Sequence, residues 1–290
     1  MEQPSPRPAD LPLPGGAPGA AVRVHPLRTA DMKAMPDFFA RPPGRLGLLK
    51  GAGLHVPRSR WFWLPIPAFL VEHPAAGPIL IDTGLHELVA TDVGAALGRA
   101  AKLLFTIRME PSWAVPNQLR ERGVDPADVS LVVMTHLHYD HASGLSQFPH
   151  ATIAVDAREW ELAARGRMTD GYMGRLFPAA NDWLLLPAAA EEIDLLGDGS
   201  IRLLSTPGHT PGHRSVILRL AGDRELLLTA DAVYARRTLD ESLTPLLTWD
   251  DDAYRASLAK LQAWIAAHPD APVVPGHDED TWRTLPAVYE

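Results

Sequence analysis

Short runs of apolar residues, separated by polar and turn-forming residues, recur along most of the chain. The run at 131–134, Leu-Val-Val-Met, has no polar alternation. A continuous apolar run of this length is typical of a strand that is buried on both faces. Similar runs, rich in β-branched or aromatic residues, predict strands at residues 61–71, 79–81, 131–135, 151–155, 201–204, 216–220, 225–229 and 271–274.

Apolar residues at helical spacing appear between several of these strands. We predict short helices at 113–123, which ends at Gly123, and at 158–165. A longer amphipathic helix is predicted at 251–267, because four apolar residues lie on one of its faces: Tyr254, Leu258, Leu261 and Ile265. Strands that alternate with helices indicate an α/β (α+β) protein.

Three regions have a weaker pattern. Prolines and glycines dominate residues 1–20, so we predict a flexible leader there, followed by a single domain over residues 21–290. Residues 22–54 give only a weak strand signal, with turn signals at 42–44 and 51–53. Residues 166–186 are aromatic and irregular.

Composition restricts the possible partners. Lys and Arg number 27 against 35 Asp and Glu, so the formal net charge is −8, which argues against a nucleic-acid-binding surface. The absence of cysteine excludes disulfides, thiolate zinc ligands and cysteine nucleophiles. No apolar run is long enough to span a membrane, and the N-terminus lacks the features of a secretory signal. We expect a cytoplasmic protein that binds neither nucleic acid nor membrane; the sequence leaves a homodimer open.

Four potential metal ligands crowd together directly after the apolar run 131–134. Burying several polar side chains side by side is costly unless something binds them. A divalent metal ion is the usual occupant of a cluster of imidazoles and carboxylates. The sequence therefore predicts that a metal ion binds here, to His136, His138, Asp140 and His141.

Three further candidate ligands stand at the ends of other predicted strands: His209, Asp231 and His277. The two histidines each follow Pro-Gly, where glycine lets the backbone turn sharply and approach a neighbour closely. With the first four, these residues make five imidazoles and two carboxylates. That set suffices for two metal ions with about three protein ligands each, if one carboxylate bridges them. Two such ions generate hydroxide and polarise a carbonyl or phosphoryl oxygen.

The order and separation of these motifs resemble those of the metallo-β-lactamase fold hydrolases. His-x-His-x-Asp-His, Pro-Gly-His, a strand-end Asp and a final Gly-His occur in the same order over about residues 60–280. The resemblance implies a four-layer αββα sandwich of two sheets flanked by helices. It also implies two ligand groups bridged by Asp231: His136, His138 and His209 for one ion, and Asp140, His141 and His277 for the other.

Two more residues are expected near the ions. Asp82, in Asp82-Thr83-Gly84, resembles the family's Asp-Thr-Gly, whose carboxylate orients a ligand imidazole. On local grounds alone, Asp82 suits a turn with a helix cap equally well. His213 lies four residues after His209, and we expect it to support the site from behind a ligand.

Within that family the sequence is most similar to the N-acyl homoserine lactonases, which are quorum-quenching enzymes. The similarity lies in residues 65–74, 82–86, 135–144 and 229–234, with one departure in Ala-Ser-Gly at 142–144, where Ala-Gly-Gly is usual. It implies that Tyr234, three residues after Asp231, contacts the lactone carbonyl. A packing role would also explain this aromatic side chain.

The resemblance therefore implies a hydrolase that opens the lactone ring of N-acyl homoserine lactones by attack of metal-bound hydroxide on the carbonyl. Tyr234 would polarise the carbonyl oxygen, and Asp140 or a water would return the proton. Zinc is the expected metal, although iron, manganese or cobalt would suit the same ligands. The alternatives are hydrolysis of another lactone, an aryl ester or a phosphotriester, and, more remotely, a non-catalytic metal-binding protein.

An acyl chain would need an apolar groove beside the metals. The apolar stretches at 46–54, 61–63 and 172–177 are candidates for its walls, and core packing explains them equally well.

Overall fold

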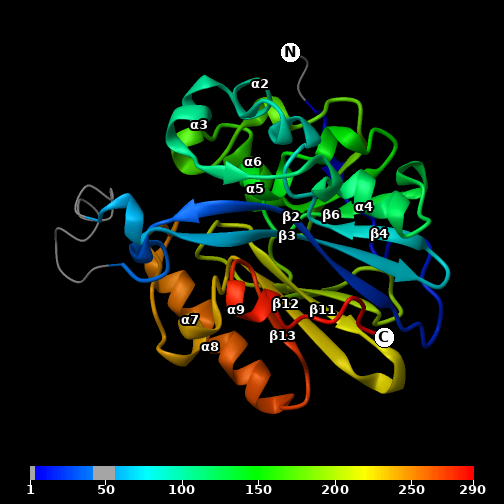
Figure 1. Cartoon of the computed structure of the whole chain (residues 1–290). Coiled ribbons are helices and arrows are strands. Elements are labelled where there is room, and N and C mark those ends of the chain that lie inside the picture. The colour runs from blue at the N-terminus through cyan, green and yellow to red at the C-terminus, as the bar shows by residue number, and fades with distance from the viewer. Residues whose placement is uncertain (1–3, 42–55) are drawn as a thin grey trace.

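The computed structural model describes residues 4–41 and 56–290. Two β-sheets pack face to face, and helices cover their outer faces, so the molecule has four layers (Figure 1). The αββα sandwich expected from the sequence is thus confirmed.

The first sheet has eight strands in the order β1-β8-β7-β6-β4-β3-β2-β5. The five strands from β1 to β4 in this order run parallel, and β3, β2 and β5 extend the sheet antiparallel. Their bounds are β1 (Arg7–Pro8), β2 (Arg23–Ala34), β3 (Phe62–His73), β4 (Gly77–Ile81), β5 (Ile107–Arg108), β6 (Leu131–Val133), β7 (Thr152–Asp156) and β8 (Trp183–Leu186).

The second sheet has five strands in the order β13-β12-β11-β10-β9. Neighbours are antiparallel except for β12 and β13, which run parallel, so their carboxyl ends lie at the same edge. The bounds are β9 (Glu192–Asp194), β10 (Ile201–Ser205), β11 (Arg214–Arg219), β12 (Glu225–Ala230) and β13 (Val273–Pro275).

The helices divide between the two outer faces (Figure 1). The helices α2 to α6 lie on the side of the eight-stranded sheet, while α7 and α8 lie on the side of the five-stranded sheet. The long helix predicted at 251–267 is α8, which buries Tyr254, Leu258 and Leu261. The bounds are α2 (Val93–Leu97), α3 (Arg99–Leu104), α4 (Val115–Glu121), α5 (Tyr139–Ala142), α6 (Ala157–Ala163), α7 (Arg236–Asp240), α8 (Asp251–Ala267) and α9 (Glu279–Trp282).

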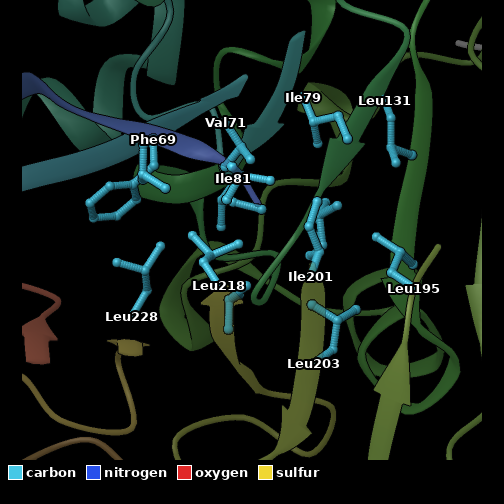
Figure 2. Packing of buried hydrophobic residues seen from close by; sticks show 14 of the residues in the cluster. Phe69, Val71, Ile79, Ile81, Leu131, Leu195, Ile201, Leu203, Leu218 and Leu228 are labelled. Atoms are coloured by element: carbon cyan, nitrogen blue, oxygen red, sulfur yellow. The ribbon is translucent and has the colours of Figure 1, made fainter. Parts of the chain in front are cut away.

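Both faces of the central strands are buried, which explains their continuous apolar runs. In β11, Val216 and Leu218 face the other sheet, whereas Ile217 faces α8. In β4, Ile79 and Ile81 likewise point between the sheets. Figure 2 shows this inner layer, in which side chains of β3, β4 and β6 meet those of β10, β11 and β12. Alternating side chains thus fill the space between the sheets and the space under the helices.

The structure differs from the flexible leader expected over residues 1–20. From residue 4 onward the segment lies along the sandwich: β1 pairs with β8, and the Leu13 amide donates to the Leu195 carbonyl at 2.8 Å. Leu13 is buried in the layer between the sheets. Proline suits this place because β1 is an edge strand and one side of it needs no donor. The proline- and glycine-rich composition of this segment did not indicate these contacts.

Other weakly patterned regions also contain strands. Residues 23–34 form β2, a long strand whose register shifts between Arg28 and Ala30, so its side chains do not alternate regularly. The irregular stretch 166–186 ends in β8. The turns expected at 42–44 and 51–53, and the candidate groove segment 46–54, lie outside the described residues.

No helix within residues 4–41 and 56–290 is long and apolar enough to cross a membrane.

Truncating Leu218 tests the layer between the sheets. Its side chain is fully buried, so Leu218→Ala should lower the free energy of unfolding by about 2–5 kcal/mol through lost apolar contact and a cavity. Urea unfolding of the metal-free protein measures this. Leu103→Ala is the matched control, because Leu103 is 81% exposed and its loss should change little. Equal losses in both variants would contradict this account of the core.

Candidate metal centre

The seven candidate ligands gather at one edge of the sandwich, where loops follow strands of both sheets. Four of them follow β6, partly on the short helix α5. The other three follow strands of the five-stranded sheet. In order along the chain, the ligands lie after β6 (His136, His138, Asp140 and His141), after β10 (His209), after β12 (Asp231) and after β13 (His277). The carboxyl ends of strands are where open α/β sheets place their sites.

These side chains form three overlapping groups whose ligand atoms lie within 4.8 Å of one another. Two of the groups are the ligand sets that the family resemblance implies, and the third joins Asp231 to one histidine from each of them. The members are His136, His138 and His209; Asp140, His141 and His277; and His136, His141 and Asp231.

Asp231 lies between the two sets. Its Oδ1 is 3.2 Å from His141 Nε2 and 3.1 Å from His277 Nε2. Its Oδ2 is 3.3 Å from His209 Nε2 and 3.8 Å from His136 Nε2. Oδ2 also lies 3.3 Å from His277 Nε2, so Oδ1 faces one ligand set, Oδ2 faces both, and the carboxylate as a whole lies between the two sets, as a bridging carboxylate must.

The surroundings act differently on the two ligand sets, lowering the pKa values of His136, His138 and His209 and raising those of His141 and His277. Burial lowers the pKa of His136 and His209 well below the usual value and that of His138 to about 4, so these imidazoles are neutral. Burial alone would raise the pKa of Asp231, but the histidines around it, His277 first, hold it well below its usual range. At His141, burial is outweighed by Asp231 and Asp82, which raise its pKa well above the usual value. The site thus favours positive charge between these carboxylates.

Several buried atoms of the cluster lack hydrogen-bond partners, which fits a site that binds cations. His136 Nε2, His141 Nε2 and Asp231 Oδ1 are buried and make no hydrogen bond within the described part of the chain. The last two atoms lie 3.2 Å apart but are not oriented to form one. Buried polar atoms without partners are costly, and all three are of the kind that bind divalent metals. The residues present therefore fit two divalent ions.

Asp82 supports the cluster from the end of β4. Its backbone is left-handed, with φ of 57°, and its carboxylate accepts hydrogen bonds from the Thr135 amide and hydroxyl, each at 2.8 Å. Asp82 Oδ2 also lies 2.8 Å from His141 Nδ1. The other ring nitrogen of His141 consequently faces Asp231. This geometry favours the orienting role over a plain turn.

His213 lies behind Asp231, outside the three ligand groups. Its Nε2 accepts a hydrogen bond from the Asp231 amide at 3.1 Å, and its Nδ1 lies 2.9 Å from the Thr206 hydroxyl. His213 thus holds the backbone that carries Asp231. That backbone is constrained, because the preceding Ala230 has φ of 43°, a conformation that residues other than glycine rarely adopt.

Close packing explains the glycine before His209. Gly208 has φ of 132°, and a Cβ there would lie 2.3 Å from the Tyr254 backbone nitrogen. Only glycine lets this loop pass so close to the start of α8, as expected from the Pro-Gly-His motif.

The Tyr234 hydroxyl is not free, because it lies against one of the candidate ligands, His209. The Tyr234 ring is buried, stacks on Phe38 at 4.8 Å between centroids, and its hydroxyl lies 3.0 Å from His209 Nδ1. It also lines the cavity that opens onto the cluster. From this position Tyr234 can orient His209 and can also reach a ligand in the cavity.

That cavity, of about 630 Å³, joins the cluster to an apolar wall. Four residues of the cluster line it: His138, Asp140, His209 and Asp231. Of the expected wall stretches, Trp61 and Tyr172 do line it, whereas Phe177 packs against Trp160 and Trp183 in the core. Sequence reasoning missed most of the apolar wall of this cavity, which includes Met32, Met35, Phe38, Leu104, Phe105, Met168, Leu247 and Trp249.

Sequence reasoning also missed Glu159. It lies in the first turn of α6, where an acidic residue usually helps to start a helix and faces water. In the structure it is fully buried beneath the ligand loops. The only signal in the sequence is that start-of-helix position, and it does not reveal burial.

The profile of the Metallo-beta-lactamase superfamily matches residues 61–277, a span that contains all seven candidate ligands. The chain belongs to this superfamily.

Its relatives in this superfamily include lactonases. It is 37% identical to N-acyl homoserine lactonase AttM of Agrobacterium fabrum over 236 residues, covering 78% of this chain and 87% of that protein. A solved N-acyl homoserine lactone hydrolase with N-hexanoyl-L-homoserine at its catalytic metal center has a TM-score of 0.74 at 23% identity, over 91% and 96% of the two chains. AidC, a dizinc quorum-quenching lactonase, has a TM-score of 0.60 at 17% identity, over 92% and 89%.

Replacing Asp231 by Asn tests the bridging geometry of this superfamily member. The amide keeps the shape but loses the negative charge between the two ligand sets, so Asp231→Asn should bind fewer divalent ions per chain than the wild type. Elemental analysis after dialysis measures the metal content. Asp223→Asn, in an exposed turn, is the matched control and should keep wild-type content. Full metal loading of Asp231→Asn would contradict the bridging role.

Proposed function

We propose that this protein hydrolyses the lactone ring of N-acyl homoserine lactones and so acts in quorum quenching. One observation supports this most directly: a single cavity is lined both by four residues of the cluster, His138, Asp140, His209 and Asp231, and by many apolar side chains. A homoserine lactone has the same division, with a polar ring and an apolar acyl chain. The 37% identity to AttM, a protein named for this activity, supports the same substrate class.

In this proposal the cluster holds two divalent ions. His136, His138 and His209 would hold one ion, Asp140, His141 and His277 would hold the other, and Asp231 would lie between them. Two such ions, when bound, supply a hydroxide at neutral pH and polarise the carbonyl of the ester. We propose zinc, because His and carboxylate ligands suit it and AidC is a dizinc lactonase.

The protein's own side chains then have distinct tasks. The Tyr234 hydroxyl donates to the carbonyl oxygen, where negative charge develops when the carbonyl carbon is attacked and before the ring opens. Asp140, which lines the cavity, would take up the proton of the attacking hydroxide and pass it to the oxygen that leaves the ring. Asp82 orients the His141 ring, and His213 holds the Asp231 backbone.

The acyl chain lies along the apolar wall. Met32, Phe38 and Phe105 stand on this wall, beside the cluster, and exclude water from the reacting ester. Leu104, Leu247 and Trp249, each more than half exposed, are the wall residues most accessible to solvent. A cytoplasmic location suits this proposal, because acyl homoserine lactones that reach the cell interior are the signals to be opened.

A substrate panel tests the proposed function. Purified zinc-loaded protein should release acid from homoserine lactones of short and long acyl chain fastest, and removal of metal by a chelator should abolish the release. Acid release is followed beside other lactones, aryl esters, a phosphotriester and a cephalosporin. A higher kcat/KM for any of these other classes would reject the proposed substrate. If the protein turned over none of the compounds in the panel, the proposal that it is a hydrolase would be rejected.

Tyr234→Phe tests the hydroxyl at the carbonyl. The variant should lose roughly 10-fold to 10²-fold in kcat, by analogy with other oxyanion donors, while its metal content stays at the wild-type level. Kinetics and elemental analysis are measured on the same preparation. An unchanged rate would leave Tyr234 a packing residue. Loss of metal would instead assign its hydroxyl to holding His209.

A further inference from the structure

Glu159 is a fully buried carboxylate beneath the candidate metal centre, and the proposed reaction does not use it. It lies on α6, and both of its oxygens accept hydrogen bonds. Oε1 accepts from the Leu137 amide at 2.9 Å and from the Tyr172 hydroxyl at 3.0 Å. Oε2 accepts from the Gly212 amide at 3.2 Å. A buried carboxylate with several donors fixes each of their positions.

Two of these contacts hold the loops that carry imidazoles. Leu137 stands between His136 and His138, so its amide sets the path of the backbone that presents both rings. Gly212 follows His209 by three residues, in the loop between β10 and β11. One carboxylate thus joins the loops of three imidazoles, although these loops come from different sheets.

The third contact reaches His138 through Tyr172. The Tyr172 ring packs on the His138 ring, with 4.8 Å between centroids, and the two residues form an antiparallel bridge. Tyr172 is itself buried. By fixing the Tyr172 hydroxyl, Glu159 therefore restrains the face of His138 as well as its backbone.

The loop around Gly212 is shaped for this approach. A Cβ on Gly212 would lie 2.4 Å from the Glu159 backbone nitrogen and 2.5 Å from its Cβ. Such contacts are too short for any other residue, so glycine is required for the loop to reach Glu159.

The second ligand set has separate supports. His141 is held by Asp82, through its Nδ1 at 2.8 Å. His277 Nδ1 lies 2.8 Å from the Pro65 carbonyl on β3. Neither of these supports belongs to α6 or contacts Glu159.

We propose that Glu159 is a positioning residue for one of the two ion sites, the one formed by His136, His138 and His209. This inference rests on the proposed function, because it needs the two ions. The inference goes beyond the proposed function because it assigns to Glu159, on α6, an effect on the affinity of only one of the two ions. Residues that orient metal ligands commonly change metal affinity by about 10-fold to 100-fold when replaced.

Glu159→Gln tests the inference. Its amide nitrogen cannot accept a hydrogen bond, so at least one of the three contacts is lost, while the side-chain volume is kept. Zinc-loaded protein is dialysed against increasing chelator, and the metal content per chain is measured. We expect one ion to leave at roughly 10-fold to 100-fold lower chelator strength than in the wild type and the other to leave as before.

X-ray absorption of the singly loaded variant identifies the ion that remains. The proposed ligand sets differ in imidazole count, three in the set near Glu159 and two in the other. The ion that remains in Glu159→Gln should therefore have about two imidazole ligands. Three imidazoles would overturn the assignment.

Glu161→Gln is the matched control, because Glu161 lies on the same helix and is exposed. It should release both ions as the wild type does. The melting temperature of each metal-free protein separates folding from binding. Equal weakening of both ions in Glu159→Gln, or no weakening, would overturn the inference.

Two further outcomes stay distinguishable. If Glu159→Gln does not fold, Tyr172→Phe removes one donor and leaves the carboxylate. It should weaken the same ion to a smaller degree, and unchanged release would overturn the inference. If the wild type itself binds no metal, the proposed function fails, irrespective of Glu159.

Discussion

The Asp231 carboxylate is buried among imidazoles of both ligand sets, with Oδ1 facing one set and Oδ2 facing both. Such a group is unfavourable in a protein interior unless cations or hydrogen bonds compensate it. Its position therefore has to be imposed by the fold. β12 lies between β11 and β13, Ala230 adopts a left-handed conformation, and His213 fixes the following amide. Much of the surrounding architecture consists of supports for this one carboxylate.

The geometry of the cluster also depends on the packing between the sheets. His136 to His141 follow a strand of the eight-stranded sheet, whereas the other ligands follow strands of the five-stranded sheet. The distances across the site are thus set by the apolar layer that separates the sheets (Figure 2). Dense interiors transmit small shifts in packing, so residues far from the ions, such as Leu218, share in fixing the site.

The sequence allowed the central strands and the seven-residue cluster to be predicted, because both leave local marks. An apolar run identifies β6, and three histidines within six residues identify a polar cluster that burial would make costly. Contacts between distant segments leave no such mark. The prolines of residues 4–20 suggested flexibility, yet β1 completes the edge of a sheet. Glu159 occupies a helix start, where acidic residues are usually exposed. Only the fold shows that the loops containing Leu137 and Gly212 contact it. The irregular register of β2 hid a long strand for the same reason.

The two ends of the cavity are built from different kinds of structure. The polar end stands on strand ends, which the sheets hold in place, whereas much of the apolar wall comes from loops and short helices such as residues 36–38, 168–172 and 247–249. Loops tolerate changes in sequence that strands in a core do not. The metal-ligand residues can therefore stay the same in proteins whose apolar walls differ. A shared set of metal ligands consequently determines the type of reaction more firmly than it determines the substrate. For this protein, the length of the acyl chain of the proposed substrate must consequently be inferred from the wall beside the cluster.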